Sequence, residues 1–191
     1  MMNYGIVDFV HRFIKEHVKP GDICIDATAG NGYDTKFLCE LVGTSGEVIG
    51  MDIQEIAIKN TKKRLSENAL LDRAKLVLDS HTEMGNYAEK NSVSCIVFNL
   101  GYLPGGDHNL ATKAENSIEA MKIALELLKK DGLLSVTIYS GKDSGFEERD
   151  KVLEWLKTLD SKKFLVIMSQ YYNRPNHPPI PVQIVKLTEV D

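Results

Sequence analysis

Hydrophobic and polar positions follow two alternating periods along this chain. Short apolar runs rich in β-branched residues are separated by segments whose apolar residues recur at helical spacing, which is typical of strands alternating with amphipathic helices. Strands are predicted at 22–26, 46–52, 74–78, 93–99, 133–139, 164–170 and 181–188. Helices are predicted from Ile6 to a stop before Pro20, and at 34–42, 56–65, 82–89, 113–130 and 146–159.

This order of elements predicts an α/β fold with a mainly parallel sheet and helices on both faces. The last two predicted strands are joined by a Pro-rich loop, 171–180, that has no room for a crossover helix. We therefore expect them to be antiparallel neighbours, forming a hairpin at the end of a seven-stranded sheet.

The segment 26–35 follows the first predicted strand and opens a helix. Gly30 and Gly32 permit a tight turn and a close approach of a ligand to the main chain. Open α/β sheets bind ligands at the carboxyl ends of their strands, and Asp52 ends the second strand, where an acid can bind ribose hydroxyls. For the two glycines alone, an ordinary turn remains an alternative.

The side chains around these glycines favour a cofactor with an amine and a nucleoside but no pyrophosphate. The dinucleotide fingerprint requires a third glycine where this chain has Thr35, and Asp26 could hold an amine. S-adenosylmethionine (SAM) has these groups. Ile53 and Gln54 could contact the adenosine, and Asp79 or Ser80 could reach the adenine amine.

A candidate reaction site follows the fourth predicted strand. Asn99 precedes a loop containing Gly, Tyr and Pro, similar to the Asn/Asp-Pro-Pro-Tyr motif of amino-methyltransferases with the prolines replaced. A carboxamide and an aromatic face can hold an amine in position, so Asn99 and Tyr102 are the predicted catalytic residues. Asp107 is preferred to His108 as the proton acceptor. A purely structural Gly-rich loop is the alternative.

The loop before the last strand carries a second group of polar and aromatic side chains. Tyr172, Asn173 and Arg174, together with His108, are predicted to contact the substrate, because aromatic side chains and an arginine can stack a splayed-out base and bind phosphate. A rigid hairpin connection would explain the same residues.

Composition limits the possible classes of protein. The 191 residues are expected to form one domain, 1–191, with residues 1–20 as an N-terminal helix. No apolar run reaches membrane-spanning length, and no signal peptide is recognisable, so we expect a cytoplasmic location. Cys24 and Cys95 lie in apolar runs as core residues would, and no metal site is predicted. A net charge of −4 does not itself predict nucleic-acid binding.

Taken together, five motifs resemble those of the YtqB-like (MnmM) bacterial methyltransferases, which have the Rossmann-like class I methyltransferase fold. The motifs are 26–35, Asp52-Ile53-Gln54, Ser80-His81, 99–107 and 173–179. The resemblance implies N-methylation of 5-aminomethyl-2-thiouridine at the tRNA wobble position, contact with the anticodon loop, and a homodimer. The expected SAM site then comprises Asp26, Gly30, Asn31, Gly32, Asp34, Thr35, Asp52, Ile53, Gln54, Ser80 and His81.

Other functions remain open at this stage. The same chemistry could act on rRNA or on a small amine. A non-catalytic SAM-binding protein would need the cofactor loop without a working acceptor site, and the segment from Asn99 to Asp107 argues against it. An NAD-dependent reductase is disfavoured by Thr35.

Overall fold

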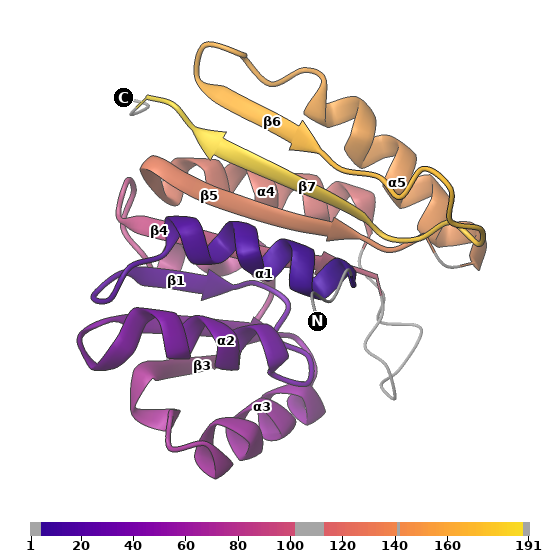
Figure 1. Cartoon of the computed structure of the whole chain (residues 1–191). Helices are drawn as coiled ribbons and strands as arrows, with labels where there is room; N and C mark the ends of the chain where they lie inside the picture. The colour runs from indigo at the N-terminus through magenta and orange to yellow at the C-terminus, as the bar shows by residue number, and fades with distance from the viewer. Residues whose placement is uncertain (1–4, 102–112, 141, 189–191) are drawn as a thin grey trace.

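A computed structural model describes residues 5–101, 113–140 and 142–188 of the chain. It contains the predicted alternation of strands and helices (Figure 1). The strands are β1 (Ile23–Asp26), β2 (Glu47–Asp52), β3 (Ala74–Leu78), β4 (Val93–Leu100), β5 (Leu128–Ile138), β6 (Phe164–Met168) and β7 (Ile180–Lys186). The helices are α1 (Ile6–His17), α2 (Tyr33–Val42), α3 (Glu55–Glu67), α4 (Ala114–Leu127) and α5 (Lys142–Leu156), with 3-10 turns η1 (Gly43–Ser45), η2 (Leu71–Arg73) and η3 (His81–Asn86).

The seven strands form one sheet in the order β3-β2-β1-β4-β5-β7-β6. Neighbours from β3 to β5 are parallel, whereas β7 is antiparallel to both β5 and β6. The predicted α/β class and the antiparallel end of the sheet are confirmed. The chain winds outward from β1 to β3 and then returns to place β4 on the other side of β1. The strand order therefore reverses between β1 and β4, where α/β sheets open a ligand crevice.

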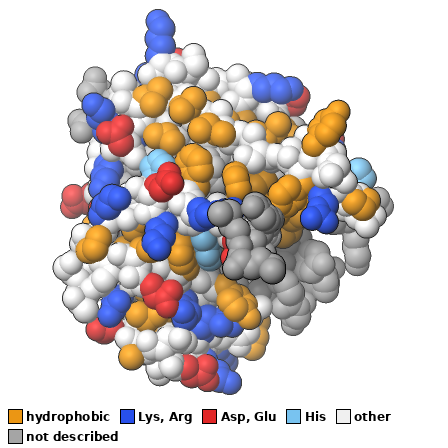
Figure 2. Space-filling model, viewed as in Figure 1, with side chains coloured by type: hydrophobic (Ala, Val, Ile, Leu, Met, Phe, Trp, Pro, Cys, Tyr) orange, Lys and Arg blue, Asp and Glu red, His pale blue; other side chains and the backbone are white. Residues whose placement is uncertain are grey.

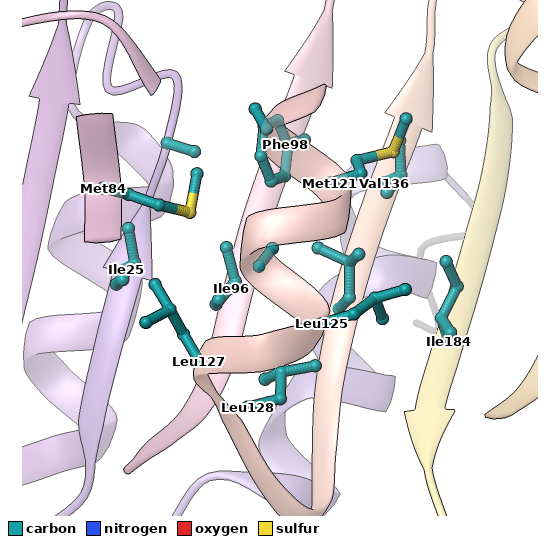
Figure 3. Packing of buried hydrophobic residues seen from close by; sticks show 14 of the residues in the cluster. Ile25, Met84, Ile96, Phe98, Met121, Leu125, Leu127, Leu128, Val136 and Ile184 are labelled. Carbon is teal, nitrogen blue, oxygen red and sulfur yellow. The ribbon is translucent and has the colours of Figure 1, made fainter. Parts of the chain in front are cut away.

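Helices α1, α2 and α3 cover one face of the sheet, and α4 and α5 cover the other (Figure 1). Successive residues of β4 alternate between the two cores, as strand geometry requires: Cys95 and Val97 face one core, and Ile96 and Phe98 face the other. Figure 3 shows α4 packed against the sheet through Met121 and Leu125. All three cysteines are buried and free, as predicted for Cys24 and Cys95.

The junction between α4 and β5 differs from the prediction. The helix was expected to reach Lys130, but it ends at Leu127, and β5 begins at Leu128. The predicted turn at Asp131-Gly132 is instead an irregularity within β5, with Asp131 at φ 62°. Helical spacing of apolar residues therefore continued for about one turn beyond the helix itself.

A buried lysine caps the end of α4. Lys186 is fully buried in β7, and its Nζ donates hydrogen bonds to the carbonyl oxygens of Leu125 (2.9 Å) and Leu128 (2.6 Å) and to Asn91 Oδ1 (2.8 Å). The last carbonyls of a helix have no partner within the helix and carry its negative dipole. The ammonium group supplies both the donor and the opposite charge there.

Two other elements differ in extent or type. The segment predicted as a short helix at 82–89 is the 3-10 turn η3, and α5 begins at Lys142 rather than 146 and ends at Leu156 rather than 159. The remaining boundaries agree to within about two residues, the usual scatter of such assignments.

Candidate cofactor and acceptor site

The site lies at the carboxyl ends of β1, β2 and β4, around the reversal of strand order. The turn after β1 begins with Asp26, which is fully buried. Its Oδ2 accepts a hydrogen bond from Thr35 Oγ1 (2.6 Å), and its Oδ1 accepts one from the Thr28 amide (3.3 Å). Burial, followed by the negative charge of Asp34, raises the pKa of Asp26 to about 7. Asp26 and Thr35 thus brace the turn from inside.

The carboxylate of Asp52, at the end of β2, holds the turn from the other side. Its Oδ2 accepts a hydrogen bond from the Gly30 amide (3.0 Å), and its Oδ1 accepts one from the Gln54 amide (2.9 Å). Ile53 between them is half exposed, whereas Gln54 is buried. The structure therefore brings the predicted Asp52, Ile53 and Gln54 against the glycine turn.

Gly32 is required for packing as well as for its backbone angle. It has φ +75°, and a Cβ there would lie 2.8 Å from the Thr61 Cα atom of α3. Only glycine meets both conditions without strain. Asn31 beside it is also engaged with α3, since its Oδ1 accepts from Asn60 Nδ2 (3.0 Å) and its carbonyl accepts from Arg64 Nε (2.6 Å).

Asp34, in the first turn of α2, connects three elements. Its Oδ2 accepts a hydrogen bond from Asn99 Nδ2 at the end of β4 (2.7 Å), and its Oδ1 lies 2.6 Å from His11 Nε2 on α1. The Asn99 main-chain amide also donates to Thr28 Oγ1 (2.8 Å). Two hydrogen bonds, to Thr28 and to Asp34, therefore connect Asn99 at the end of β4 to the segment that follows β1. The predicted cofactor loop and the predicted acceptor residue are therefore in direct contact.

Residues after β3 form the far rim of the site. Ser80 caps η3, its Oγ accepting from the Thr82 amide (3.2 Å), and Asp79 Oδ2 accepts from the Tyr87 hydroxyl (2.8 Å). His81 is partly buried near Phe98, with ring centroids 5.7 Å apart, and this burial lowers its pKa. Its ring is thus held against the core rather than free at the surface.

The loop between β6 and β7 lines a cavity of about 250 Å³ at the carboxyl ends of β5 and β6. Arg149 of α5 contributes to its wall together with Tyr172, Arg174 and His177 from the loop. Tyr172 is 97% exposed, and His177 packs edge-on against Phe146 with centroids 5.2 Å apart. The predicted substrate loop thus joins the antiparallel strands β6 and β7 and lines a cavity beside them.

Three predicted residues, Tyr102, Asp107 and His108, lie outside the described residues. Sequence reasoning also missed two contributors to the site. Thr28 could have been found, because it stands inside the 26–35 motif. His11 gave no such signal, because its contact with Asp34 spans 23 positions of the chain.

Comparison with known proteins connects this geometry to a family. Residues 48–185 match the family model described as “Putative rRNA methylase”. The chain is 34% identical over 186 residues to the chloroplastic tRNA (mnm(5)s(2)U34)-methyltransferase of Arabidopsis thaliana, with 90% of this chain and 66% of that protein covered. The chain thus spans just under two thirds of the length of that relative.

Solved structures give a similar picture. A “putative rRNA-methylase” from Clostridium thermocellum has a TM-score of 0.94 and 47% identity, covering 98% of this chain and 100% of its own. A “putative methyltransferase” from Streptococcus mutans, in complex with SAH, has a TM-score of 0.88 and 34% identity, covering 97% and 100%.

Proposed function

The chain belongs to the family described as “Putative rRNA methylase”, a family of SAM-dependent methyltransferases, and we propose that it methylates the aminomethyl nitrogen of 5-aminomethyl-2-thiouridine at the wobble position of tRNA. The similarity to the Arabidopsis tRNA methyltransferase supports the substrate. The observation that carries the proposal is the contact of Asn99 with the glycine turn through Thr28 and Asp34.

The acceptor groups of the site fit SAM. An ammonium group and a ribose diol both require hydrogen-bond acceptors; Asp34 and Asp52 present partly exposed carboxylates around the turn, and the buried Asp26 braces the turn from inside. Ile53 offers a half-exposed apolar side chain next to Asp52, as an adenine ring requires. We assign the amine to Asp26 and Asp34, the ribose to Asp52, and the adenosine to Ile53, Gln54, Ser80 and His81. The structure of a relative in complex with SAH, the product of methyl donation, supports SAM as the cofactor.

When bound, SAM supplies an electrophilic methyl group on a sulfonium sulfur. The protein must hold an amine with its lone pair free to react, and positioning of this kind provides most of the catalysis in such transfers. Asn99 donates its Nδ2 to Asp34, so its Oδ1 is the atom available to accept an N–H from an amine. Tyr102 and Asp107 complete the proposed reaction site as an aromatic wall and a proton acceptor.

The cavity at the β6–β7 loop supports contact with RNA. Arg149 and Arg174 line it, and the fully exposed Tyr172 offers an aromatic face for stacking. Figure 2 shows basic side chains scattered among acidic and apolar ones on the face viewed, rather than gathered into one basic surface. We therefore propose a compact footprint on the anticodon loop, made by Tyr172, Asn173, Arg174 and His108.

The proposal extends to assembly and location. We propose a single methyltransferase domain, 1–191, that acts as a homodimer in the cytoplasm. Within residues 5–101, 113–140 and 142–188, no helix has the length and apolarity needed to cross a membrane. Strand β6 lies at the edge of the sheet, and an unpaired strand edge can pair with a second copy. Light scattering of the purified protein tests the dimer, and a monomeric mass would exclude it.

The test of the function uses purified protein, labelled SAM and total tRNA from a strain that lacks the terminal wobble-uridine methylation. Nucleoside mass spectrometry should then reveal the methylaminomethyl nucleoside. Asn99→Ala should form this product much more slowly, and the matched surface variant Asn68→Ala should form it at the rate of the unsubstituted protein.

A result in which tRNA acquires no label would be informative as well. If SAM raises the Tm while tRNA stays unmodified, the cofactor site is correct and the tRNA assignment is wrong. Ribosomal RNA, to which the family description refers, and small amines would then be assayed under the same conditions.

A further inference from the structure

A histidine on the N-terminal helix lies in the site from a distant part of the chain. His11 Nε2 is 2.6 Å from Asp34 Oδ1, and its ring is stacked on Phe37 with centroids 3.7 Å apart and planes inclined by 3°. Asp34 and Phe37 are both on α2. The imidazole is therefore fixed at its edge by a carboxylate and at its face by an aromatic ring.

The same carboxylate fixes the side-chain amide of Asn99. Asp34 Oδ2 accepts from Asn99 Nδ2 at 2.7 Å, and the side chains of His11 and Asp34 are about one-fifth exposed. A carboxylate only accepts hydrogen bonds, so it must face the NH₂ end of the amide and the N–H of the imidazole. The carbonyl Oδ1 of Asn99 is consequently directed away from Asp34.

We propose that His11 is a positioning residue for methyl transfer, which holds Asp34 in the orientation that directs Asn99 Oδ1 toward the substrate amine. This inference rests on the proposed function, in which Asn99 Oδ1 accepts the substrate N–H. Without His11, one oxygen of Asp34 loses its donor, and the carboxylate can rotate about χ2. Asn99 then loses the rigid partner that defines the orientation of its amide, although every group of the reaction site is still present.

An alternative role for His11 is packing alone, as an aromatic ring between α1 and α2. Two substitutions separate these roles. His11→Phe keeps a flat ring to stack on Phe37 and removes the donor, whereas His11→Gln keeps a donor at a similar reach and removes the ring. A packing role predicts that the phenylalanine variant is the less affected of the two, and a positioning role predicts the reverse.

The kinetic test measures kcat and KM for tRNA together with Tm. His11→Phe should lower kcat about tenfold with little change in KM for tRNA or in Tm, as expected for an interaction that acts only in the transition state. His11→Gln should recover kcat to within about threefold of the unsubstituted enzyme. In an Asn99→Ala background, His11→Phe should lower kcat by less than about twofold, because the effects of substituting residues that act through one another are not additive.

A spectroscopic readout needs neither substrate nor cofactor. The Asn99 side-chain NH₂ signal, identified in ¹⁵N-labelled protein by its absence from Asn99→Ala, should move in His11→Phe and remain nearly in place in His11→Gln. An unmoved signal in His11→Phe, or an equal kcat loss in both backgrounds, would overturn the proposal. If the unsubstituted enzyme leaves tRNA unmethylated, the proposed function fails, whereas the NMR result still decides the positioning of Asn99.

Discussion

Replacing the buried acid of the glycine turn should change how stability depends on pH. Asp26 is fully buried, and its pKa rises from an ordinary value of 3.8 to about 7 through burial and then through the charge of Asp34. In the Asp26→Asn variant, the side-chain oxygen can still accept from the Thr28 amide, and the new NH₂ group can donate to Thr35 Oγ1. The variant therefore removes the ionisation while keeping the hydrogen-bonded geometry.

The direction in which stability changes with pH follows from the raised pKa of Asp26 in the folded state. The folded protein binds this proton more tightly than the unfolded chain, so the contribution to stability is full below pH 3.8 and is lost as the pH rises through about 7. The whole loss is roughly 4 kcal/mol, because one pKa unit corresponds to about 1.4 kcal/mol. Between pH 5 and pH 8 the part still to be lost is about 2 to 3 kcal/mol.

Urea denaturation of the native sequence and of Asp26→Asn at several pH values measures this loss. The free energy of unfolding of the variant, relative to the native sequence, should rise by about 2 to 3 kcal/mol from pH 5 to pH 8. The exposed Asp72→Asn variant is a control whose curve should stay parallel to that of the native sequence. Parallel curves for Asp26→Asn as well would refute the reasoning, since Asp26 would then ionise alike in the folded and unfolded states.

Three further predictions concern the site and the core. Asp52→Ala removes the acceptor for the Gly30 amide and should weaken SAM binding at least tenfold in calorimetry, whereas Asp52→Asn, which keeps one acceptor oxygen, should weaken it less. Lys186→Met leaves buried carbonyls at the end of α4 without their donor and should lower the free energy of unfolding by about 3 kcal/mol. Substitution of the exposed Lys162 by Met should change the free energy of unfolding by less than about 0.5 kcal/mol. Tyr172→Ala should raise KM for tRNA about tenfold at unchanged Tm, by loss of one stacked base.

The sequence predicted those parts of the fold that depend on local pattern. Every strand and main helix was expected, because each has its own apolar period and its own stops, such as Pro20-Gly21 after α1. The end of α4 was not predicted correctly, since Leu127 and Leu128 continue the apolar pattern of the helix. The carbonyl of Leu128, where the strand begins, is bound by Lys186, which is 58 positions away along the chain. No local pattern contains that contact.

The same distinction applies to the site. Thr28 and Thr35 both donate hydrogen bonds to Asp26 within the 26–35 motif, and Asp52 accepts from the amide of Gln54 two residues on, so the sequence motifs predict their proximity. Prediction of contacts between elements requires the strand order as well. The partners of Asp34, namely Asn99 and His11, lie 65 and 23 positions away.

The adjacency of β1 and β4 joins these local and distant contacts into one site. Because Asp26 pairs in register with Val97, the turn after β1 and the end of β4 leave the sheet at the same height, which puts Thr28 within hydrogen-bonding distance of the Asn99 amide. The residues assigned to the cofactor and the residue assigned to the acceptor therefore share hydrogen bonds rather than only a crevice. A substitution at Asn99 should accordingly disturb Asp34 and the SAM affinity as well as the reaction, and one at Asp34 should disturb the orientation of Asn99. The proposed assignment therefore predicts that cofactor binding and positioning of the substrate are coupled, because Asp34 is assigned to the SAM amine and also holds the amide of Asn99.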